Sequence, residues 1–348
     1  MTSDDVVMGK SYRAADRQVE LKIGSTTIQD TFAEAFSMQC ARVVVTAHNQ
    51  RWLDAAVAEF SGYGSSVIGC DAEVGLERLV GESETLDGRP GASLLIFGFS
   101  NQAVEAALCN RAGQCLMTCP TTAVFDGLVA GSKRDAGKGD GEDEVVGEDQ
   151  QDADTTMAGE RISLGKQLRF FGDGFQKSKL IGERRFWRVP VMDGEFIVED
   201  SVCVTKGVAG GNFLILATDQ IAGLGAAERA VDQIAKLDRV ITPFPGGVVR
   251  SGSKVGSRYP KLKASTSEAF CPTLRGRIES KESKLPPEVG CVYEIVIDGT
   301  DFESVAQAIK TGVQAAAGEG VVEISSGNFD GKLGKHHFYL HELLKEST

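Results

Sequence analysis

The sequence predicts an α+β protein with two lobes, each an α/β sandwich of ferredoxin-like, split β-α-β topology. Its 348 residues exceed the usual size of one domain core, so we expect two. Strand-like and helix-like segments also follow the same β-α-β order in both halves, which indicates an internal duplication. We expect a tail at residues 1–20, an N-terminal lobe at 21–190 and a C-terminal lobe at 191–348.

The first half of the chain alternates between short apolar runs and helical patterns. Alternation predicts strands at 19–23 and 26–30, and Thr31 with Glu34 forms a capping-box pattern that predicts a helix through Cys40. Further along we expect strands at 42–47, 65–70 and 92–98 and helices at 52–59 and 102–112.

The second half begins with a strand-rich stretch and then repeats the order of the first half. The predicted strands lie at 166–171, 186–191, 195–204, 212–217, 239–243 with an extension toward 250, 290–299 and 321–325, and the predicted helices at 224–235 and 302–316.

Charge is concentrated in one segment. Residues 131–160 contain ten acids and three bases of a chain with a formal net charge of −12, and few large apolar side chains, so we expect a disordered acidic insertion. The remainder is only mildly acidic and has no basic stripe, which argues against a nucleic-acid partner.

The cellular compartment is predicted from two features that the sequence lacks. No apolar run approaches 18 residues and the N-terminus has no hydrophobic signal region, so we expect a cytoplasmic protein with no membrane span. The eight cysteines lie mostly in apolar runs and never as C-x-x-C, which favours reduced thiols over disulfides or a zinc site.

One strand carries a carboxylate among apolar residues. In the run from Gly290 to Gly299, Glu294 shares one face with Val292 and Val296. A poorly hydrated carboxyl group without a cation should have a raised pKa and hold a proton near neutrality, as an acid/base group in acyl transfer does. Pairing with a Lys or Arg, or exposure on an edge strand, would remove this property.

Three Gly-rich segments in the second half predict a binding cleft. They run from Gly207 to Phe213, from Pro243 to Ser257 and from Ser325 to Gly334. Glycine lets backbone amides approach a ligand, and Asn or Ser adds hydrogen-bonding groups. The residues predicted to bind substrate are Gly210, Gly211, Asn212, Phe213, Gly246, Gly247, Ser251 and Lys254.

Several common motifs are absent or nonspecific. G-x-G-x-x-G does not occur, and Ser253 separates Gly252 from Lys254 where a P-loop needs adjacent Gly and Lys. Ser251-x-x-Lys254 matches a Ser/Lys nucleophile pattern, but so does Ser163-x-x-Lys166. His336, His337 and His341 lie in a strand-like run in which His337 and His341 would share a face.

The motifs together resemble one family, the formylmethanofuran:tetrahydromethanopterin formyltransferases, over residues 19–342. The runs that carry the resemblance are Asp30–Phe36, Asp87–Gly91, Gly113–Cys115, Phe170–Gly174, Gly194–Ser201, Gly207–Phe213, Pro243–Gly247, Ser253–Ser257, Cys271–Thr273 and Cys291–Ile297.

The resemblance implies reversible formyl transfer between the amine of methanofuran and N5 of tetrahydromethanopterin, without a metal or bound cofactor. It implies Glu294 as the acid/base residue and a homotetramer. The N-terminal extension and the acidic insertion resemble the bacterial branch, whose members serve formaldehyde oxidation as a subunit of a formyltransferase/hydrolase complex. Asp330 stands where the family has Gly, which places a side chain at a possible positive-φ position.

Two alternatives to a formyltransferase stay open at this level. One is a non-catalytic scaffold subunit of the same complex, and the other is a Ser/Lys amidohydrolase that uses Ser251 and Lys254. In a formyltransferase, backbone amides near Gly210–Asn212 or near Gly246–Gly247 could donate hydrogen bonds to the reacting oxygen.

Overall fold

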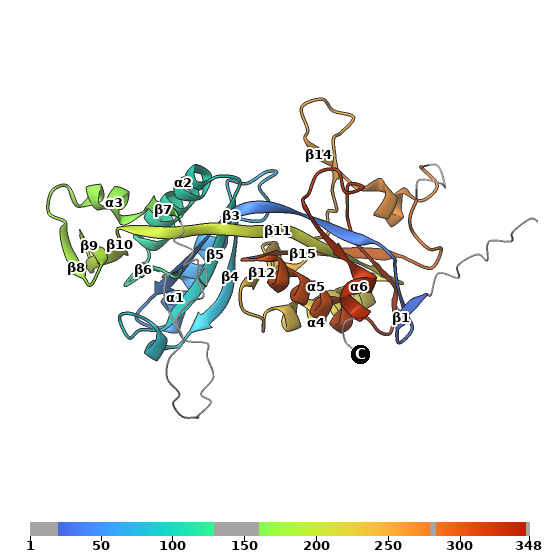
Figure 1. The fold of residues 1–348 in the computed structure, drawn as a ribbon, viewed down its shortest axis with the longest axis horizontal. Coiled ribbons are helices and arrows are strands. Elements are labelled where there is room, and N and C mark those ends of the chain that lie inside the picture. Colours follow the sequence, from blue (N-terminus) through green and yellow to red (C-terminus); the bar gives the residue numbers. More distant parts are fainter. Residues whose placement is uncertain (1–19, 129–159, 279–282, 346–348) are drawn as a thin grey trace, which may run out of the picture.

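Two long strands run along an elongated molecule and connect its two lobes (Figure 1). The structure is a computed structural model that describes residues 20–128, 160–278 and 283–345. β3 (Phe32–Thr46) and β11 (Ser201–Ala217) pair antiparallel, with Phe36 opposite Ala209 and Ala41 opposite Val204. Because both strands extend beyond this shared stretch, each contributes to the sheet of both lobes.

The N-terminal lobe is an antiparallel sheet with two helices packed on one face. Its elements are α1 (Gln50–Ser61), β4 (Glu73–Val80), the 3₁₀ turn η1 (Glu82–Glu84), β5 (Gly91–Gly98), α2 (Asn101–Arg111), the π turn η2 (Ala112–Leu116) and β6 (Ala123–Asp126). The strands lie in the order β6-β3-β5-β4. Each helix begins at a polar cap, because Asn49 accepts the Trp52 N–H and Ser100 accepts the Ala103 N–H.

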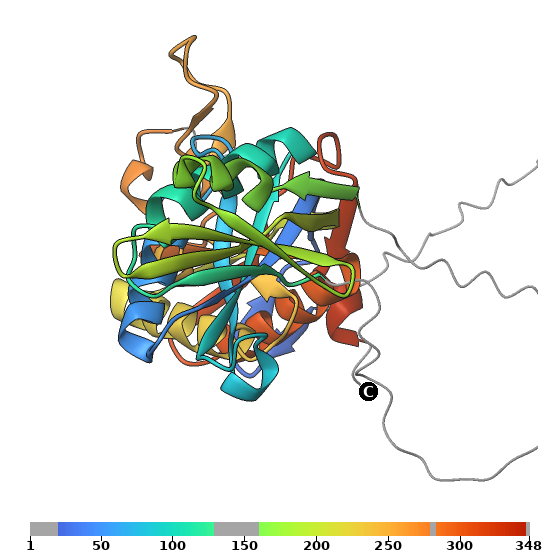
Figure 2. The ribbon, with the colours of Figure 1, turned by 90° about the vertical axis from the view of Figure 1, so that its left-hand side faces the viewer.

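A smaller sheet extends this lobe at the end of the molecule that faces the viewer in Figure 2. Its elements are β7 (Glu160–Ser163), α3 (Gly165–Leu168), the 3₁₀ turn η3 (Arg169–Gly172), β8 (Lys177–Ile181), β9 (Arg184–Val191) and β10 (Gly194–Glu199). β10 pairs parallel with β6 and antiparallel with β9, and β7 pairs with β11. Arg184 donates its Nε–H to the buried Glu199 at 2.8 Å, which fixes β9 against β10.

The C-terminal lobe repeats the arrangement. Its elements are α4 (Gln220–Ile234), β12 (Val240–Ile241), β15 (Cys291–Gly299), α5 (Phe302–Ala316), β16 (Val321–Ser325), β17 (His336–Tyr339) and α6 (Leu340–Lys345), together with the N-terminal strands β1 (Leu21–Ile23) and β2 (Thr26–Ile28). The strand order is β16-β11-β15-β12. Ile295 and Ile297 of β15 pack with α4 and α5 in a closed apolar core.

A long excursion between β12 and β15 covers the other face of this sheet. It contains the 3₁₀ turns η4 (Pro245–Gly247), η5 (Glu268–Phe270) and η6 (Pro272–Leu274) and the hairpin of β13 (Lys254–Val255) and β14 (Ala264–Ser265), which projects from the body in Figure 1. Phe270 and Leu285 pack onto Leu214 and Leu216 of β11. The sheet is therefore covered on both faces near β11, by helices on one side and by this excursion on the other.

The predicted duplication is visible in the topology. Both lobes run β-α-β-β-α-β, and in both the fourth strand lies beside the first, and the third separates the first from the second. The predicted α+β class with two ferredoxin-like lobes is therefore confirmed. The division between residues 190 and 191 stays a prediction, since Ala33 and Ala35 pack in the C-terminal core while Val202 and Val204 pack in the N-terminal core.

The predicted helix from Thr31 to Cys40 is wrong, because these residues belong to β3. This part of β3 pairs with β17 through Phe32–Ala35 and with β11 through Phe36–Cys40. Glu34 bonds a distant loop instead of capping a helix. Sheet pairing therefore overrides the local capping pattern.

Four further expectations differ from the structure. Residues 65–70, predicted as a strand, form turns, and the next strand is β4, which the pattern did not predict. Residues 166–171, also predicted as a strand, form α3 and η3, where the N–H of Lys166 bonds the Asp200 carbonyl. β12 ends at Ile241, and positive φ angles at Gly246 and Gly247 interrupt any extension. His341 lies in α6 and bonds the Ile28 carbonyl, so it does not share a strand face with His337. The predicted acidic insertion lies outside the described residues apart from Glu160.

Candidate active site

Glu294 lies on the face of the C-terminal sheet that points away from α4 and α5. It is paired with Leu214 of β11 on one side, and on the other its backbone exchanges two hydrogen bonds with Val249, at 2.8 and 3.0 Å. Ile295 and Ile297 point to the helices, while Val292 packs on the opposite face with Leu214. The strand and its two faces are as the sequence predicts.

Burial raises the pKa of the Glu294 carboxyl group to about 7. The side chain keeps some accessible surface but is enclosed by protein atoms. Among the described residues its carboxyl group forms no ion pair and no hydrogen bond, so no cation opposes the effect of desolvation. The group can therefore hold a proton close to neutral pH and can exchange it with a ligand.

Asn212 ties the first Gly-rich segment to the third on the same face as Glu294. Its Nδ2 donates to the carbonyl oxygens of Gly210 and Gly327, both at 3.1 Å, and its Oδ1 accepts the Gly327 N–H at 2.6 Å. These contacts use both N–H donors of the amide and one of the two lone pairs of its oxygen. Asn212 therefore positions the loop that follows β16 and is occupied by that task.

Glu34 holds the rest of that loop through four backbone N–H groups. Its carboxylate accepts from Phe329, Gly331 and Leu333 at 2.6 to 3.0 Å, and from Gly334. Burial alone would raise the pKa of Glu34, but these four donors outweigh it and lower the pKa. The carboxylate thus stays ionised and acts as an anchor for residues 329–334.

The same loop contains Asp330, for which the sequence predicted a possible positive φ angle. Asp330 has φ of +57° and Gly331 has φ of +69°. Left-handed backbone is tolerated by Asp better than by most residues because its short side chain can bond locally. The loop therefore keeps its turn although Asp330 carries a side chain.

The second Gly-rich segment reaches the site through Val249. Gly246 and Gly247 have φ of +62° and +74°, and Gly247 donates its N–H to the Phe244 carbonyl at 2.7 Å. A Cβ at Gly247 would collide with Val231, whereas one at Gly246 would meet nothing within 4 Å. Open space next to a backbone is where a ligand can approach, so Gly246 is better placed for this than Gly247.

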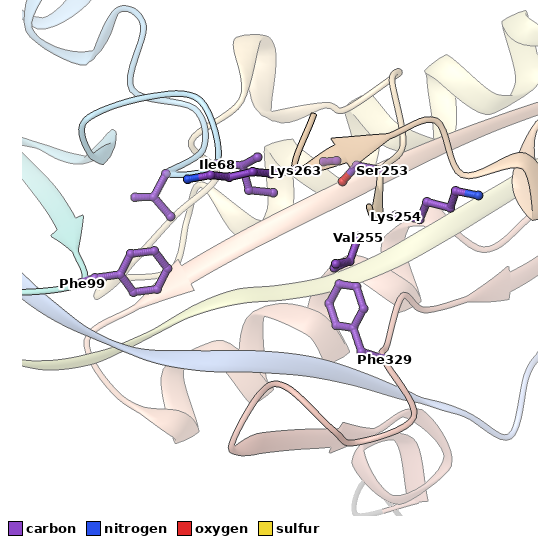
Figure 3. A pocket seen from close by; sticks show the side chains of 9 residues that line it. Ile68, Phe99, Ser253, Lys254, Val255, Lys263 and Phe329 are labelled. Atoms are coloured by element: carbon purple, nitrogen blue, oxygen red, sulfur yellow. The ribbon is translucent and has the colours of Figure 1, made fainter. Parts of the chain in front are cut away.

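A cleft of about 240 Å³ opens between the two lobes (Figure 3). In the view, Phe99 and Ile68 of the N-terminal lobe lie on one side, and Val255 and Phe329 on the other. The lining is Val67, Ile68, Phe99, Ser253, Lys254, Val255, Lys263, Ala264 and Phe329. An apolar cleft with the Lys263 ammonium group at its wall suits a ligand with a flat apolar part and a negative charge.

Three of the predicted substrate-binding residues have structural tasks instead. Phe213 is fully buried in the core between the sheet and α5, so its predicted substrate contact is corrected to a packing role. Gly211 faces α5, where a Cβ would lie 2.4 Å from Val305. Gly210 donates its N–H to Asp298 at 2.9 Å, so this amide is not available to a substrate oxygen.

Ser251 and Lys254 do not form a nucleophile pair. Ser251 is exposed, and the Lys254 ammonium pairs with Glu268 rather than with Ser251. This ion pair also lowers the pKa of Glu268. Lys254 does line the interlobe cleft.

The sequence did not reveal the N-terminal side of the cleft. Val67, Ile68 and Phe99 carry no motif, since ordinary apolar residues become cleft residues only when the lobes meet. Glu34 was also missed, because its spacing from Thr31 matched a helix cap; the Gly-rich loop that it anchors was the only signal.

No group of three or more metal-ligating side chains is arranged to hold a metal ion within the described ranges. Nor does any helix there combine the length and apolar character needed to cross a bilayer.

Comparison with known proteins identifies the family. One family model, formylmethanofuran-tetrahydromethanopterin formyltransferase, matches residues 21–141 and 149–191, and a second, its proximal lobe, matches residues 194–343. The chain belongs to the formylmethanofuran–tetrahydromethanopterin formyltransferase family. Among named members of this formyltransferase family, it is 47% identical to the enzyme of Methylobacillus flagellatus over 326 residues, covering 92% of this chain and 99% of the relative.

Solved formyltransferases share the fold. The formylmethanofuran:tetrahydromethanopterin formyltransferase from Methanosarcina barkeri superposes with a TM-score of 0.80 at 44% identity, covering 93% of this chain and all of that one. The formyltransferase/hydrolase complex (FhcABCD) from Methylorubrum extorquens, solved with methylofuran, contains a chain with a TM-score of 0.82 at 40% identity, covering 93% and 99%. The resemblance seen in the sequence motifs is therefore confirmed.

Proposed function

We propose that this chain catalyses reversible transfer of a formyl group between the amine of methanofuran and N5 of tetrahydromethanopterin, with Glu294 as the acid/base residue. Membership of the formyltransferase family supports the reaction. The observation that supports the residue is the carboxyl group of Glu294, which has no cation partner among the described residues and has a pKa near 7.

Formyl transfer requires that the methanofuran nitrogen gains a proton and that N5 of tetrahydromethanopterin loses one. When N5 attacks the formyl carbon, a C–N bond forms, the carbonyl oxygen gains negative charge and N5 becomes positively charged. Protonated Glu294 donates to the methanofuran nitrogen as its C–N bond breaks, and the carboxylate then takes the proton from N5. The proton count is balanced, and the reverse reaction uses the same group in the same two states.

A backbone amide near Gly246 is the proposed donor to the reacting oxygen. Gly246 has open space beside its Cα and lies three residues before Val249, whose backbone bonds that of Glu294. A preorganised N–H at this place would stabilise the oxyanion of the tetrahedral adduct. The cleft between the lobes would hold one coenzyme, with Lys263 toward its anionic part.

Activity of the purified chain tests this function. We expect N-formylmethanofuran and tetrahydromethanopterin to give N5-formyl product without added metal or cofactor, and the product to revert when methanofuran is in excess. No transfer by the folded chain, with transfer restored only by other subunits, would favour the scaffold function instead.

Assembly and compartment follow as further proposals. The Methylorubrum relative is part of a formyltransferase/hydrolase complex, and we propose that this chain also works as a subunit of such a complex or as a homotetramer. All eight cysteines are free thiols, which supports a reducing compartment, the cytoplasm. Native mass spectrometry of the chain alone and with its complex partners would distinguish the two assemblies.

Replacing Ser251 by alanine separates a substrate contact from a nucleophile. We expect Ser251→Ala to leave kcat unchanged and to raise one KM by about two- to tenfold, the value of one neutral hydrogen bond. Ser163→Ala, at the other Ser-x-x-Lys run, is the matched control. A collapse of kcat, or hydrolysis of formylmethanofuran that is lost only in Ser251→Ala, would support the amidohydrolase alternative.

A further inference from the structure

Two buried carboxyl groups from opposite lobes face each other beside the cleft. Glu73 of β4 is 6% exposed and Asp298 of β15 is fully buried. The two carboxyl groups lie within hydrogen-bonding reach of each other, and the Ser66 hydroxyl group also contacts Glu73. The oxygens Glu73 Oε2 and Asp298 Oδ2 are buried, and no N–H or O–H group of the described residues donates to them.

A hydrogen bond between two carboxyl groups needs one proton, because two carboxylates have only acceptors. Burial and the charge of Glu73 raise the pKa of Asp298, and burial also raises the pKa of Glu73. Two buried like charges at contact distance cannot both form without a cation. The pair therefore carries one proton and one negative charge, with the proton on the more deeply buried Asp298.

The described surroundings of the pair offer no cation to neutralise a second charge. From β3 the nearest titratable groups are the fully buried thiol of Cys40, whose pKa is raised beyond its usual range by burial, and the guanidinium of Arg42. Arg42 donates to both oxygens of Glu77, at 2.6 and 2.7 Å, so its charge is already compensated. Val67 and the bulge at Gly210 contribute backbone N–H groups, and Ser66 contributes a neutral hydroxyl group.

The outer oxygens of the pair hold both walls of the cleft. Glu73 Oε1 accepts the Val67 N–H at 3.0 Å, and Val67 lines the N-terminal wall. Asp298 Oδ1 accepts the Gly210 N–H at 2.9 Å. The Gly210 carbonyl in turn binds Asn212, which holds the loop of Phe329 on the C-terminal wall.

We propose that Glu73 and Asp298 share a single proton in a carboxyl–carboxylate hydrogen bond that joins the lobes, and that they are positioning residues for the formyl-transfer site. The inference rests on the proposed function for its catalytic meaning, but the shared proton can be tested without activity. It assigns a role to β4, a strand with no residue among the predicted site residues.

The first test is stability against pH for the full chain. The folded pair keeps a proton that the unfolded carboxyls lose above about pH 4.5. This contributes a tenfold fall of the folding equilibrium constant per pH unit from above the unfolded pKa until the pH reaches the raised pKa of the folded pair. In Asp298→Asn an amide N–H replaces the shared proton, so we expect urea unfolding, at one protein concentration, to show a slope smaller by this tenfold factor. Glu294 and Glu323 titrate equally in both proteins and cancel in the comparison.

Variants with and without a hydrogen-bond donor distinguish the effect of the hydrogen bond from the effect of side-chain volume. Asp298→Asn and Glu73→Gln each keep one donor and one negative charge, and we expect both variants to fold. Asp298→Leu leaves the Glu73 carboxylate unpaired, which lowers the folding equilibrium constant roughly ten- to hundredfold. It should also raise KM, because Val67 and Gly210 lose their fixed positions.

The pH dependence of activity gives a readout that a purely structural role would not move. The ratio of kcat/KM for Asp298→Asn to that of the wild type should increase at alkaline pH, since the amide does not lose its donor. An unchanged pH slope of stability in Asp298→Asn would overturn the shared proton. Stabilisation of the wild type by Mg²⁺ or Ca²⁺, lost in Asp298→Asn, would overturn it in favour of a cation site. If the slope changes but no variant alters kcat/KM, the positioning role is wrong although the shared proton stands.

Discussion

Glu294→Gln is expected to lower kcat for formyl transfer by about 10²- to 10⁴-fold, the usual contribution of general acid/base catalysis. Glutamine has nearly the same shape and can still fill the site, so coenzyme binding should persist. It cannot give its proton to the departing nitrogen or accept one from N5. Single-turnover assays with both coenzymes, together with binding measurements, would separate the lost chemistry from lost affinity.

The same variant should also be more stable than the wild type at alkaline pH. Because the folded pKa of Glu294 is raised to about 7, the folded protein holds a proton that the unfolded chain has released. Stability from this group is therefore fully present below about pH 4.5 and falls as the pH rises to 7. Glutamine removes the penalty, a gain of at most about 3 kcal/mol at pH 8, measurable by urea unfolding.

Glu323→Gln is the matched control for Glu294→Gln. Glu323 lies on the same sheet face in β16 and its pKa is also raised, chiefly by burial, but it accepts a hydrogen bond from Gln29 at 2.6 Å. We expect turnover in Glu323→Gln to remain close to that of the wild type. Near-normal turnover in Glu294→Gln, or an equal loss in both variants, would remove Glu294 from the mechanism.

Glu34→Ala is the second change with a large expected effect. It leaves four backbone N–H groups of residues 329–334 without their acceptor. We expect the free energy of unfolding to fall by about 3 kcal/mol, the value of one or two charge-assisted hydrogen bonds, because water replaces part of the lost contacts once the loop relaxes. Phe329 would then leave its place at the cleft. A displacement of this kind can cost about 100-fold in kcat/KM.

The pH dependence of this anchor has the opposite sign to that of Glu294. The four donors hold the folded pKa of Glu34 below its unfolded value, so its stabilisation is present above the unfolded pKa of about 4.5 and is lost as the pH falls through the folded pKa. Acid unfolding of the wild type and of Glu34→Ala should converge at low pH. Lys332→Ala, at an exposed side chain of the same loop, should change neither stability nor kcat/KM, and an equal effect of both variants would show that the loop itself is not held by Glu34.

Local pattern was sufficient where an element's own residues decide its structure. The helix predicted at 302–316 and the strands predicted at 321–325 and 290–299 agree with α5, β16 and β15, because their apolar period matches one covered face. Local pattern failed at Thr31 to Cys40, where pairing with β17 and β11 decided the outcome. The Gly-rich segments indicated the C-terminal wall of the cleft. The N-terminal wall consists of apolar residues that belong to no recognisable motif.

The sequence by itself determined that Glu294 lies on an apolar strand, on the face opposite Ile295 and Ile297, because alternation is a property of the strand. Only the tertiary structure decided which partner each buried carboxyl group meets. Within the described part of the chain, Glu294 meets no cation, Glu34 meets four N–H groups, and Asp298 meets Glu73. These partners come from distant parts of the chain through sheet pairing, and the proton affinity of a buried acid depends on such neighbours rather than on its own segment.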